Sequence, residues 1–431
     1  MLDKIFQLKN NNTTFKKEVL AGIVSFFTIV YIVVVNASIL SDAGIPLEAG
    51  IIATVLTSIA GCFIMGIWGN TPIILVPGMG VNALFTYTIV LGMGLSWQEG
   101  LAVVFVSGIL FTIIAFTKLA TIISESIPHS LKEAITVGIG FFLTFIGLQK
   151  GGIVVLSEET YVSLGDFSDS SVLLTVVTLL ITVSLFAKKI PGNFLISIII
   201  GTFLAAIFDD LSFEKTTNTT EAFRSYFDVI GAMSFDRFID LTFWTATFSL
   251  TMVIVFENIG LVFGQVHMIN RPTTYKRSLQ ANAMSTITSG ILGSSPTVST
   301  VESAAGMTAG GRTGLTSITT GTLFLTSLLF LPFIKVIPDS AIAPILILIG
   351  SLMIQNIQHI DLEDFSESFP AFLIIALIPL TYSIVDGMAF GFIMYPVLKI
   401  ILNRKQDVKM PLYFIAFLFL MNFFFHTLHY K

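Results

Sequence analysis

Charged residues are scarce in this chain. Asp, Glu, Lys and Arg make up 11% of its 431 residues, while hydrophobic residues make up 54%. Soluble domains carry about a quarter charged residues, so this composition excludes an ordinary soluble protein and predicts one that crosses a lipid bilayer many times. The few basic residues form no cluster of the kind that binds nucleic acid, and we therefore expect no nucleic-acid partner.

Cysteine and histidine are also rare. Cys62 is the only cysteine and lies in an apolar stretch, which excludes a disulfide framework and a cysteine metal site. The five histidines fall near segment ends or in loops, which argues against a metal centre within the membrane. An enzyme would need such a cluster, or a nucleophile beside a base, and neither is visible. We therefore expect no metal, no cofactor and no enzymatic activity.

Apolar stretches recur in two sets of seven. The first set is 19–40, 48–68, 72–91, 98–117, 130–149, 171–187 and 191–208, and the second is 241–264, 279–292, 297–309, 314–333, 341–357, 369–385 and 387–402. Seven crossings per half is an odd number, so the halves must be inverted relative to each other, which is typical of transporters. We predict an all-α polytopic membrane protein with 14 transmembrane segments in a 7+7 inverted repeat.

The distribution of positive charge predicts the orientation. With the N-terminus inside, sixteen Lys and Arg residues fall on the inner side and only five on the outer side: Lys150, Lys215, Arg224, Arg237 and Lys335. Cytoplasmic loops carry the excess of basic residues, so we expect a multi-pass cell-membrane protein with a cytoplasmic N-terminus. The first twenty residues show no cleavable signal pattern. A fifteenth apolar stretch, 411–428, either spans the membrane or lies along its interface.

The tenth stretch, within residues 293–314, cannot be an ordinary membrane helix. Its β-branched and hydroxyl-rich run 297–301 favours extended backbone, and the small residues 303–306 favour a short, closely packed helix. Glu302 lies between them. Irregular backbone at membrane depth persists only where it is buried in protein or lines a cavity, and an acidic residue there indicates a functional site. Ser299-x-x-Glu302 also fits a capping box, and this alternative stays open.

The inverted symmetry predicts a matching break in the third stretch. Pro72 and Pro77 bracket an extended run, and residues 78–80 (Gly-Met-Gly) form a hinge. Asn82 is then expected to open a helix that runs through Tyr87, either as a helix cap or as a group that faces a ligand. Pro and Gly at matching places in both halves indicate a binding site between the repeats.

The eighth stretch places Glu257 well inside an apolar run. A charge at that depth costs about 2.5–3.5 kcal/mol on insertion scales, and no Lys or Arg lies at comparable depth. The carboxylate is therefore protonated for part of the time, bonded to a ligand, or used in a hydrogen bond between helices. Gly260 and Gly264 share its face, which we expect to pack on a neighbour. Asn36 in the first stretch either faces the same cavity or bonds between helices.

Three strings of the sequence resemble a known family. Residues 78–85 (GMGVNALF), 256–260 (FENIG) and 301–306 (VESAAG) are similar to the azaguanine-type purine permeases of the nucleobase:cation symporter family, and the likeness extends over nearly the whole chain. The resemblance implies transport of adenine, guanine or hypoxanthine, typically with protons. Members of this branch more often carry Asp followed by Thr-Val-Gly where this chain has residues 257–260. The longer Glu257 resembles the uracil and xanthine branches instead.

The resemblance also implies a division into a core domain, segments 1–4 and 8–11, and a gate domain, segments 5–7 and 12–14. The expected parts are a cytoplasmic N-terminus (1–18), the core (19–118 and 241–333), an extracellular loop (209–240), the gate (119–208 and 334–402) and a C-terminal apolar extension (403–431). Core and gate would move against each other by an elevator or rocking motion. A monomer and a homodimer both stay open.

The chemistry of a nucleobase fits such a site. It is flat and neutral, with N–H donors that carboxylates can accept and acceptors that free helix N–H groups can meet. By the resemblance, Glu257 and Glu302 are the substrate-side carboxylates, and we expect the same pair to carry the coupling proton. The expected substrate-binding set is Glu257, Glu302, Gly80, Val81, Asn82, Thr300, Val301, Ser303 and Asn36. The alternatives are a transporter of uracil or xanthine, or a small-anion carrier, which would require a cation such as Arg312.

Overall fold

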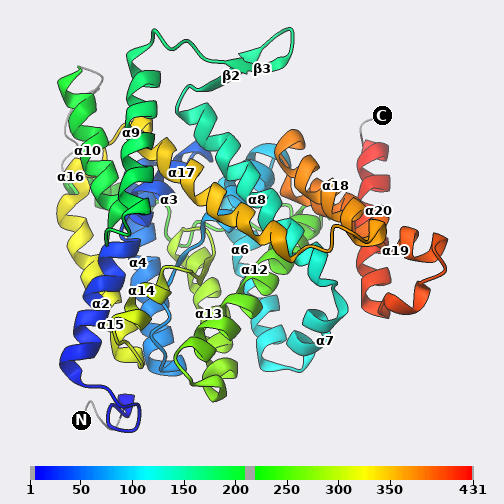
Figure 1. Ribbon diagram of the computed structural model, residues 1–431, viewed down its shortest axis with the longest axis horizontal. Helices are drawn as coiled ribbons and strands as arrows, with labels where there is room; N and C mark the ends of the chain where they lie inside the picture. The colour runs from blue at the N-terminus through cyan, green and yellow to red at the C-terminus, as the bar shows by residue number, and fades with distance from the viewer. Residues whose placement is uncertain (1–4, 209–218, 430–431) are drawn as a thin grey trace.

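Helices make up most of the computed structural model, which describes residues 5–208 and 219–429 (Figure 1). In that described part, nine helices are long and apolar enough to cross a membrane, and shorter apolar helices lie among them. The composition explains this, because backbone polar groups in lipid must be satisfied within each segment, as they are in a helix.

The first half of the chain contains α2 (Phe15–Ile29), α3 (Ile32–Asp42), α4 (Leu47–Ile64) with a π-helical end (Met65–Gly69), β1 (Leu75–Pro77), α5 (Met79–Ala83) with a π-helical continuation (Leu84–Gly92), α6 (Trp97–Phe116), α7 (Leu119–Ser126), α8 (His129–Lys150), β2 (Val154–Ser157), β3 (Tyr161–Leu164), α9 (Ser170–Ala187) and α10 (Asn193–Ile207).

The second half contains α11 (Thr219–Phe227), α12 (Leu241–Met268), a 3-10 turn (Pro272–Thr274), α13 (Tyr275–Leu292), β4 (Thr297–Ser299), α14 (Ser303–Thr308), α15 (Gly314–Ser327), a 3-10 turn (Leu328–Phe330), α16 (Leu331–Ile334), α17 (Asp339–Ile354) with a 3-10 end (Gln355–His359), α18 (Phe365–Thr381), α19 (Ile384–Ile401), a 3-10 turn (Lys405–Asp407) and α20 (Met410–His429).

Three elements differ from the expected layout. The first apolar stretch is divided into α2 and α3 at Val30 and Tyr31. The loop after α8 contains the antiparallel hairpin β2–β3. The described part of the loop 209–240 contains α11, which packs against α4 because its apolar side chains Ala222 and Tyr226 lie one turn apart. Residues 209–218 of that loop, residues 1–4 and residues 430–431 lie outside the described residues.

The third and tenth stretches each consist of a short strand followed by a short helix. β1 and β4 pair with each other in antiparallel register, with Leu75 opposite Ser299 and Pro77 opposite Thr297. All six strand residues are buried. The pairing gives the extended backbone of each half a hydrogen-bond partner in the other half, which is what allows strands to exist between membrane helices. α5 follows β1, and α14 follows β4 after the turn that carries Glu302.

The long helices pack in two groups. In one group, α13 packs against α4 and α6, and α15 packs against α2 and α4. In the other, α8 packs against α17 and α18, and α9 packs against α10 and α17. α5 contacts α8 of the second group and α12 of the first, so the broken third stretch lies where the two groups meet. Figure 1 shows α17 and α8 crossing the middle of the molecule, with α18, α19 and α20 to their right.

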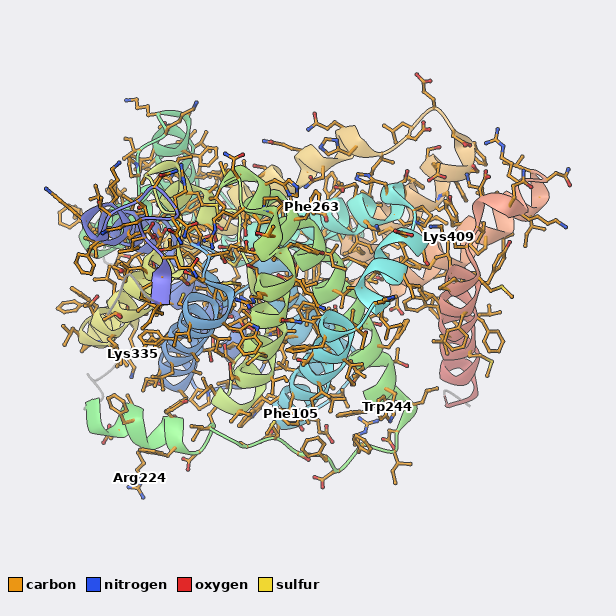
Figure 2. The ribbon with its side chains drawn as sticks, turned by 90° about the horizontal axis from the view of Figure 1, so that it is seen from below. Phe105, Arg224, Trp244, Phe263, Lys335 and Lys409 are labelled. Carbon is orange, nitrogen blue, oxygen red and sulfur yellow. The ribbon has the colours of Figure 1, made fainter. Side chains whose placement is uncertain are left out.

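Figure 2 shows the two opposite sides of the helix bundle. Arg224 of α11 and Trp244 at the start of α12 lie along one edge, whereas Phe263 near the end of α12 and Lys409 lie towards the opposite edge. α12 has 28 residues and therefore crosses from one side to the other. The segment before α12 and the segment around Lys409 thus belong to different sides.

Candidate functional site

Glu302 lies at the turn between β4 and α14, and among the described residues one side chain donates a hydrogen bond to its carboxylate. The hydroxyl of Tyr31 donates to Glu302 Oε1 at 2.6 Å. Tyr31 stands at the break between α2 and α3 and is 1% exposed, whereas Glu302 is half-buried. The side chain of Glu302 makes no capping bond to α14. One carboxylate oxygen is therefore held by the protein, while the other remains available to a ligand.

Glu257 approaches Glu302 from α12. It is half-buried, and α12 contacts α14, the helix that Glu302 precedes. The expectation that Gly260 and Gly264 pack this face on a neighbour is wrong. A methyl group added to either glycine would meet nothing within 4 Å, because this side of α12 borders open space. The side of α12 beyond Glu257 is thus open, not sealed by another helix.

Side chains of α12 also hold the end of β4. The Ser299 N–H donates to Asn258 Oδ1 at 2.8 Å, and Gln265 Nε2 donates to the Thr300 carbonyl at 2.7 Å. The Ser299 hydroxyl donates to Gln265 Oε1 at 2.5 Å. Asn258 and Gln265 are seven residues apart, which places both on the same face of α12. The helix that carries Glu257 therefore positions the backbone that leads into Glu302.

The alternative of a Ser299–Glu302 capping box is wrong. The Ser299 hydroxyl bonds to Gln265, not to a helix N–H, and Glu302 is itself the N-cap residue of α14 without a side-chain bond. The helix begins one turn later than the box requires, because the residues after Ser299 form a turn closed by a bond from the Ser303 N–H to the Thr300 carbonyl. Glu302 is thus free of a local structural role at this helix end.

The prediction that Asn82 opens the first short helix is also wrong. α5 begins at Met79 with Gly78 as its N-cap, so Asn82 lies inside the helix. Its Oδ1 accepts a hydrogen bond from the Ser295 hydroxyl, and its Nδ2, fully buried, has no partner among the described residues. Gly78 occupies the cap position, where a Cβ would collide with the Val298 side chain of β4, so the close packing there requires glycine. Asn82 is left with an uncommitted donor.

Asn36 bonds between helices. Its Nδ2 donates to the hydroxyls of Thr54 at 2.7 Å and Ser294 at 3.2 Å, and its Oδ1 accepts from the Ser295 hydroxyl at 3.1 Å. Asn36 is fully buried. Ser295 contacts both Asn36 and Asn82, so one serine links α3, α5 and the segment before β4. This network joins the two broken segments to each other and to α3.

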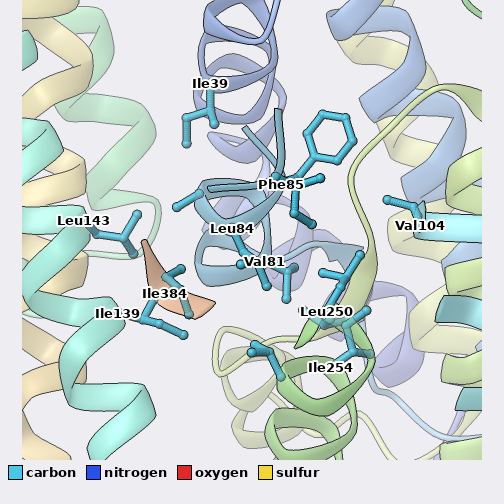
Figure 3. Close-up of a cluster of buried hydrophobic side chains, with 14 of the residues drawn as sticks. Ile39, Val81, Leu84, Phe85, Val104, Ile139, Leu143, Leu250, Ile254 and Ile384 are labelled. Carbon is cyan, nitrogen blue, oxygen red and sulfur yellow. The ribbon is translucent and has the colours of Figure 1, made fainter. Parts of the chain in front are cut away.

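Gly80 and Val81 offer only backbone to a ligand. A Cβ on Gly80 would lie 2.9 Å from Ile139 of α8, so glycine is required for the close approach of α5 to that helix. Figure 3 shows the Val81 side chain inside an apolar cluster with Ile139 of α8 and Ile254 of α12. The first N–H groups of α5 have no intrahelical partner and are the polar groups that this position can present.

The remaining predicted residues lie around Glu302. Val301 is 64% exposed, and the Thr300 hydroxyl has no hydrogen-bond partner among the described residues. The Ser303 hydroxyl accepts a bond from the Ile74 N–H at 3.0 Å, which ties the start of β1 to α14. The structure therefore places Thr300, Val301 and Ser303 at one turn. The Ser303 hydroxyl is already engaged in the hydrogen bond that holds β1.

One cavity borders α2 and another borders α3. The first, of about 640 Å³, is bordered by Thr28 of α2, the turn between α9 and α10, and Thr308 of α14. The second, of about 490 Å³, is bordered by Val34 of α3 and by Ser340, whose buried hydroxyl has no partner among the described residues.

The second cavity carries a cluster of opposite charges. Lys150 at the end of α8 lies 2.9 Å from Asp42 of α3 and 3.7 Å from Asp339 of α17. The hydroxyl of Tyr87 donates to Asp42 at 2.6 Å. These contacts join α3 of the first helix group to α8 and α17 of the second at this end of the molecule.

Arg312 is not directed at the carboxylate pair. Its guanidinium donates to the carbonyls of Met307 and Gly311, both at 2.7 Å, and so closes the C-terminal end of α14. Its backbone N–H donates to Glu18, which also accepts from the Thr316 hydroxyl. Within the described residues, no three His, Cys, Asp or Glu side chains gather as a metal site requires. Within the part of the chain that the structure describes, no Lys or Arg forms an ion pair with Glu257 or Glu302, so the site is acidic.

Sequence reasoning missed the supporting residues Tyr31, Asn258 and Gln265. Asn258 and Gln265 carried a signal, because two amides seven residues apart share one face of a membrane helix and must bond to something there. Tyr31 carried none, since a tyrosine in an apolar stretch is also common in protein cores. Its bond to Glu302 joins residues that lie in opposite halves of the chain.

Comparisons with known proteins agree on one family. A family model described as Permease family matches residues 16–422. The chain is 53% identical to the nucleobase transporter PlAzg2 of Paenibacillus larvae over 88% of this chain and 76% of that protein. It is 35% identical to the guanine/hypoxanthine permease PbuO of Bacillus subtilis (97% and 100% covered), and 33% identical to the adenine permease AdeP of Escherichia coli (100% and 97% covered).

A solved structure shares the fold. The transmembrane domain of the cyanobacterial bicarbonate transporter BicA superimposes with a TM-score of 0.67 at 15% identity, over 86% of this chain and 97% of that one. Identity at that level indicates a common helical architecture and nothing about the transported solute.

Proposed function

This chain belongs to the permease family, and we propose that it is a secondary transporter that imports purine nucleobases: adenine, guanine or hypoxanthine. The resemblance to purine permeases predicted from the strings at 78–85, 256–260 and 301–306 is confirmed by these relatives. Members of the family are transporters, in keeping with an integral membrane chain that has several apolar membrane-length helices.

The observation that carries the proposed site is the pair of carboxyl groups at the paired breaks. Glu257 and Glu302 come from α12 and from the turn before α14, two elements that contact each other, and Arg312 is engaged elsewhere. Two acceptors suit the N–H edge of a purine, while the N–H groups at the start of α5 suit its acceptors. In this proposal Val81, Gly80 and Val301 contribute backbone, Asn82 and Thr300 contribute uncommitted side-chain donors, and Asn36 and Ser303 support them.

A coupling proton fits the same pair. Two carboxylates in a site of low polarity favour the state in which they share one proton. To bind a purine, the pair must also keep carboxylate oxygens that can accept hydrogen bonds from its N–H groups. We therefore propose proton symport, with the proton carried by Glu257 and Glu302 together. A proton gradient directed inward would then drive accumulation of the base.

The proposed layout is the 7+7 inverted repeat with core and gate domains. The antiparallel pairing of β1 with β4 and the two helix groups support it. The core would contain 19–118 and 241–333, and the gate 119–208 and 334–402, with Gly80 at their contact. Movement of the core against the gate, as an elevator or by rocking, would expose the carboxylate pair to each side in turn.

We also propose a cell-membrane location with the N-terminus in the cytoplasm. The basic residues favour that orientation, and the separation of Trp244 and Lys409 to opposite sides supports it (Figure 2). Single cysteines introduced into a Cys62→Ala background would report it. A cysteine at Arg237 should react with an impermeant thiol reagent from outside, and one at Lys405 only from inside. The reverse pattern would overturn the orientation.

Competition for uptake tests the proposed function itself. Proteoliposomes containing the purified protein should accumulate radiolabelled hypoxanthine when the lumen is made alkaline, and unlabelled adenine or guanine should compete. Uracil and xanthine are included because Glu257 is longer than the Asp more usual in this branch. Competition by uracil or xanthine alone would replace the assignment to adenine, guanine or hypoxanthine, and competition by small anions alone would overturn the nucleobase proposal.

A further inference from the structure

We infer that Tyr31 is a positioning residue for nucleobase binding, which acts by holding Glu302 in its binding orientation. The inference rests on the proposed role of Glu302 as a substrate carboxylate. Tyr31 does not belong to the third or the tenth stretch and lies outside the three strings 78–85, 256–260 and 301–306.

The hydrogen bond has the geometry of a strong, charge-assisted contact. The Tyr31 hydroxyl lies 2.6 Å from Glu302 Oε1, within the range typical of an O–H donor on an ionised carboxylate. A phenol has one proton to donate, and Glu302 has two oxygens. The bond therefore restricts the rotation of the carboxyl group and leaves Oε2 to the ligand.

The environment of Tyr31 keeps this donor in place. The side chain is 1% exposed, and its ring packs edge-to-face on Phe194 of α10 at 4.8 Å between centroids. Phe194 in turn stacks on Phe186 of α9 at 6.2 Å. A buried ring fixed by an aromatic neighbour loses little further freedom when it donates to Glu302, so the carboxylate is ordered before the base arrives.

A double-mutant cycle tests the inference. Tyr31→Phe removes the hydroxyl and keeps the ring, and we expect hypoxanthine to bind about tenfold more weakly, the loss of one hydrogen bond to a charged group. Glu302→Gln should weaken binding further. Because Tyr31 acts through Glu302, the double variant should bind no more weakly than Glu302→Gln alone. Affinities would be measured by scintillation proximity on purified protein in nanodiscs.

Tyr395→Phe is the matched control. The Tyr395 hydroxyl donates to Glu367 Oε1 at 2.7 Å, a similar bond between α19 and α18 that lies away from the site. This variant should retain wild-type affinity, and the melting temperature of Tyr31→Phe should stay close to that of the control.

The outcomes separate the inference from the function on which it rests. Wild-type affinity in Tyr31→Phe, or losses that multiply in the double variant, would overturn the role of Tyr31 while leaving Glu302 in the site. Wild-type affinity in Glu302→Gln would instead overturn the proposed role of that carboxylate.

Discussion

Leu75 of β1 lies opposite Ser299 of β4 in an antiparallel register. The two residues belong to different halves of the chain, and their pairing brings both broken segments to one place between the helices. Ser299 is held in turn by Asn258 and Gln265 of α12, so the helix that carries Glu257 also sets the path of the chain into Glu302. The geometry of the candidate site follows from this three-way contact.

Replacing the carboxylate of Glu257 should abolish high-affinity binding. Glu257→Gln places an N–H donor where the proposed site requires an acceptor. An N–H group of the base would then lie against the N–H group of the glutamine, and no hydrogen bond could form. Glu257→Asp should bind more weakly than wild type but measurably, with a changed order of preference among purines, because the carboxylate is withdrawn by one methylene. Binding of hypoxanthine, adenine and guanine to purified protein would measure both effects.

The exposed Glu363 offers a control for the Glu257 variants. Glu363→Gln removes one negative charge, as Glu257→Gln does, but at a position outside the helices. It should therefore leave the affinity for purines unchanged. If Glu257→Gln bound purines as tightly as this control, Glu257 would have no part in recognition.

Glu302→Gln should separate transport from stability. Glu302 makes no capping bond to α14, so the amide should change the melting temperature by less than about 2 °C. Proton-driven accumulation of hypoxanthine in proteoliposomes should fail, because the pair can no longer share a proton. Uptake would be recorded with and without an inward proton gradient. Gradient-driven accumulation at the wild-type level would refute the proton-coupling role.

Loss of the Gln265 side-chain amide should weaken binding without touching either carboxylate. Gln265→Met keeps the length of the side chain and removes its bonds to the Thr300 carbonyl and the Ser299 hydroxyl. Each buried group left unpaired costs about 1–3 kcal/mol, and the backbone before Glu302 becomes mobile. We expect a lower melting temperature together with reduced affinity.

Gln355→Met is the control for that experiment, since Gln355 is exposed at the end of α17. If Gln265→Met lowered the melting temperature and left the affinity unchanged, the hydrogen bonds of Gln265 would stabilise the fold without shaping the site.

Breaking the Lys150 ion pairs should open the cavity of about 490 Å³. Lys150→Met removes the contacts to Asp42 and Asp339 that join the two helix groups there. Without Lys150, the carboxylates of Asp42 and Asp339 lose their positively charged partner. The protein then favours a conformation in which water can solvate these carboxylates. A cysteine at Ser41, which borders this cavity, should then react faster with a hydrophilic thiol reagent in a Cys62→Ala background.

Lys335→Met tests whether that effect is specific, because Lys335 pairs with Glu48 of α4 and not across the contact of α3 with α8. Equal acceleration by both variants would indicate a general loosening of the fold, which would contradict the role assigned to Lys150.

Asp364 should make stability depend on pH at the start of α18. Hydrogen bonds from the hydroxyl and the backbone N–H of Ser366 hold the pKa of this carboxyl below its usual range, and Lys399 and Arg404 lower the pKa further. A depressed pKa contributes stability above the unfolded value, about 3.9, which is lost as the pH falls through the folded value. Asp364→Asn should therefore lower the melting temperature at pH 7 and have a smaller effect near pH 3. An equal effect at both values would contradict the charge-based account.

Local chemistry was sufficient to locate the broken segments. Pro and Gly in residues 72–80 and the β-branched run 297–301 cannot continue a membrane helix, and each became a strand followed by a short helix. Glu257 and Glu302 stood out for the same reason, since a carboxylate in an apolar stretch has a large desolvation cost that demands a partner or a function. The rules failed where they concerned a single residue at a helix end, as for Asn82 and Ser299. The first helix begins after Gly78, which packs closely on Val298 of the other half, and the Ser299 hydroxyl bonds to Gln265 of α12.

The sequence by itself thus determined that this is a membrane protein with two interrupted segments and two acidic residues in apolar stretches. Apolar content, proline, glycine and charge determine these features, because each of them acts on residues that are close to it in the sequence. Only the tertiary structure decided which groups those acids meet. Tyr31 reaches Glu302, Ser295 joins Asn36 to Asn82, and β1 finds β4 across the two halves of the chain. Such partners are selected by packing among helices, where the geometry of every neighbour matters, and no local pattern of residues encodes that geometry.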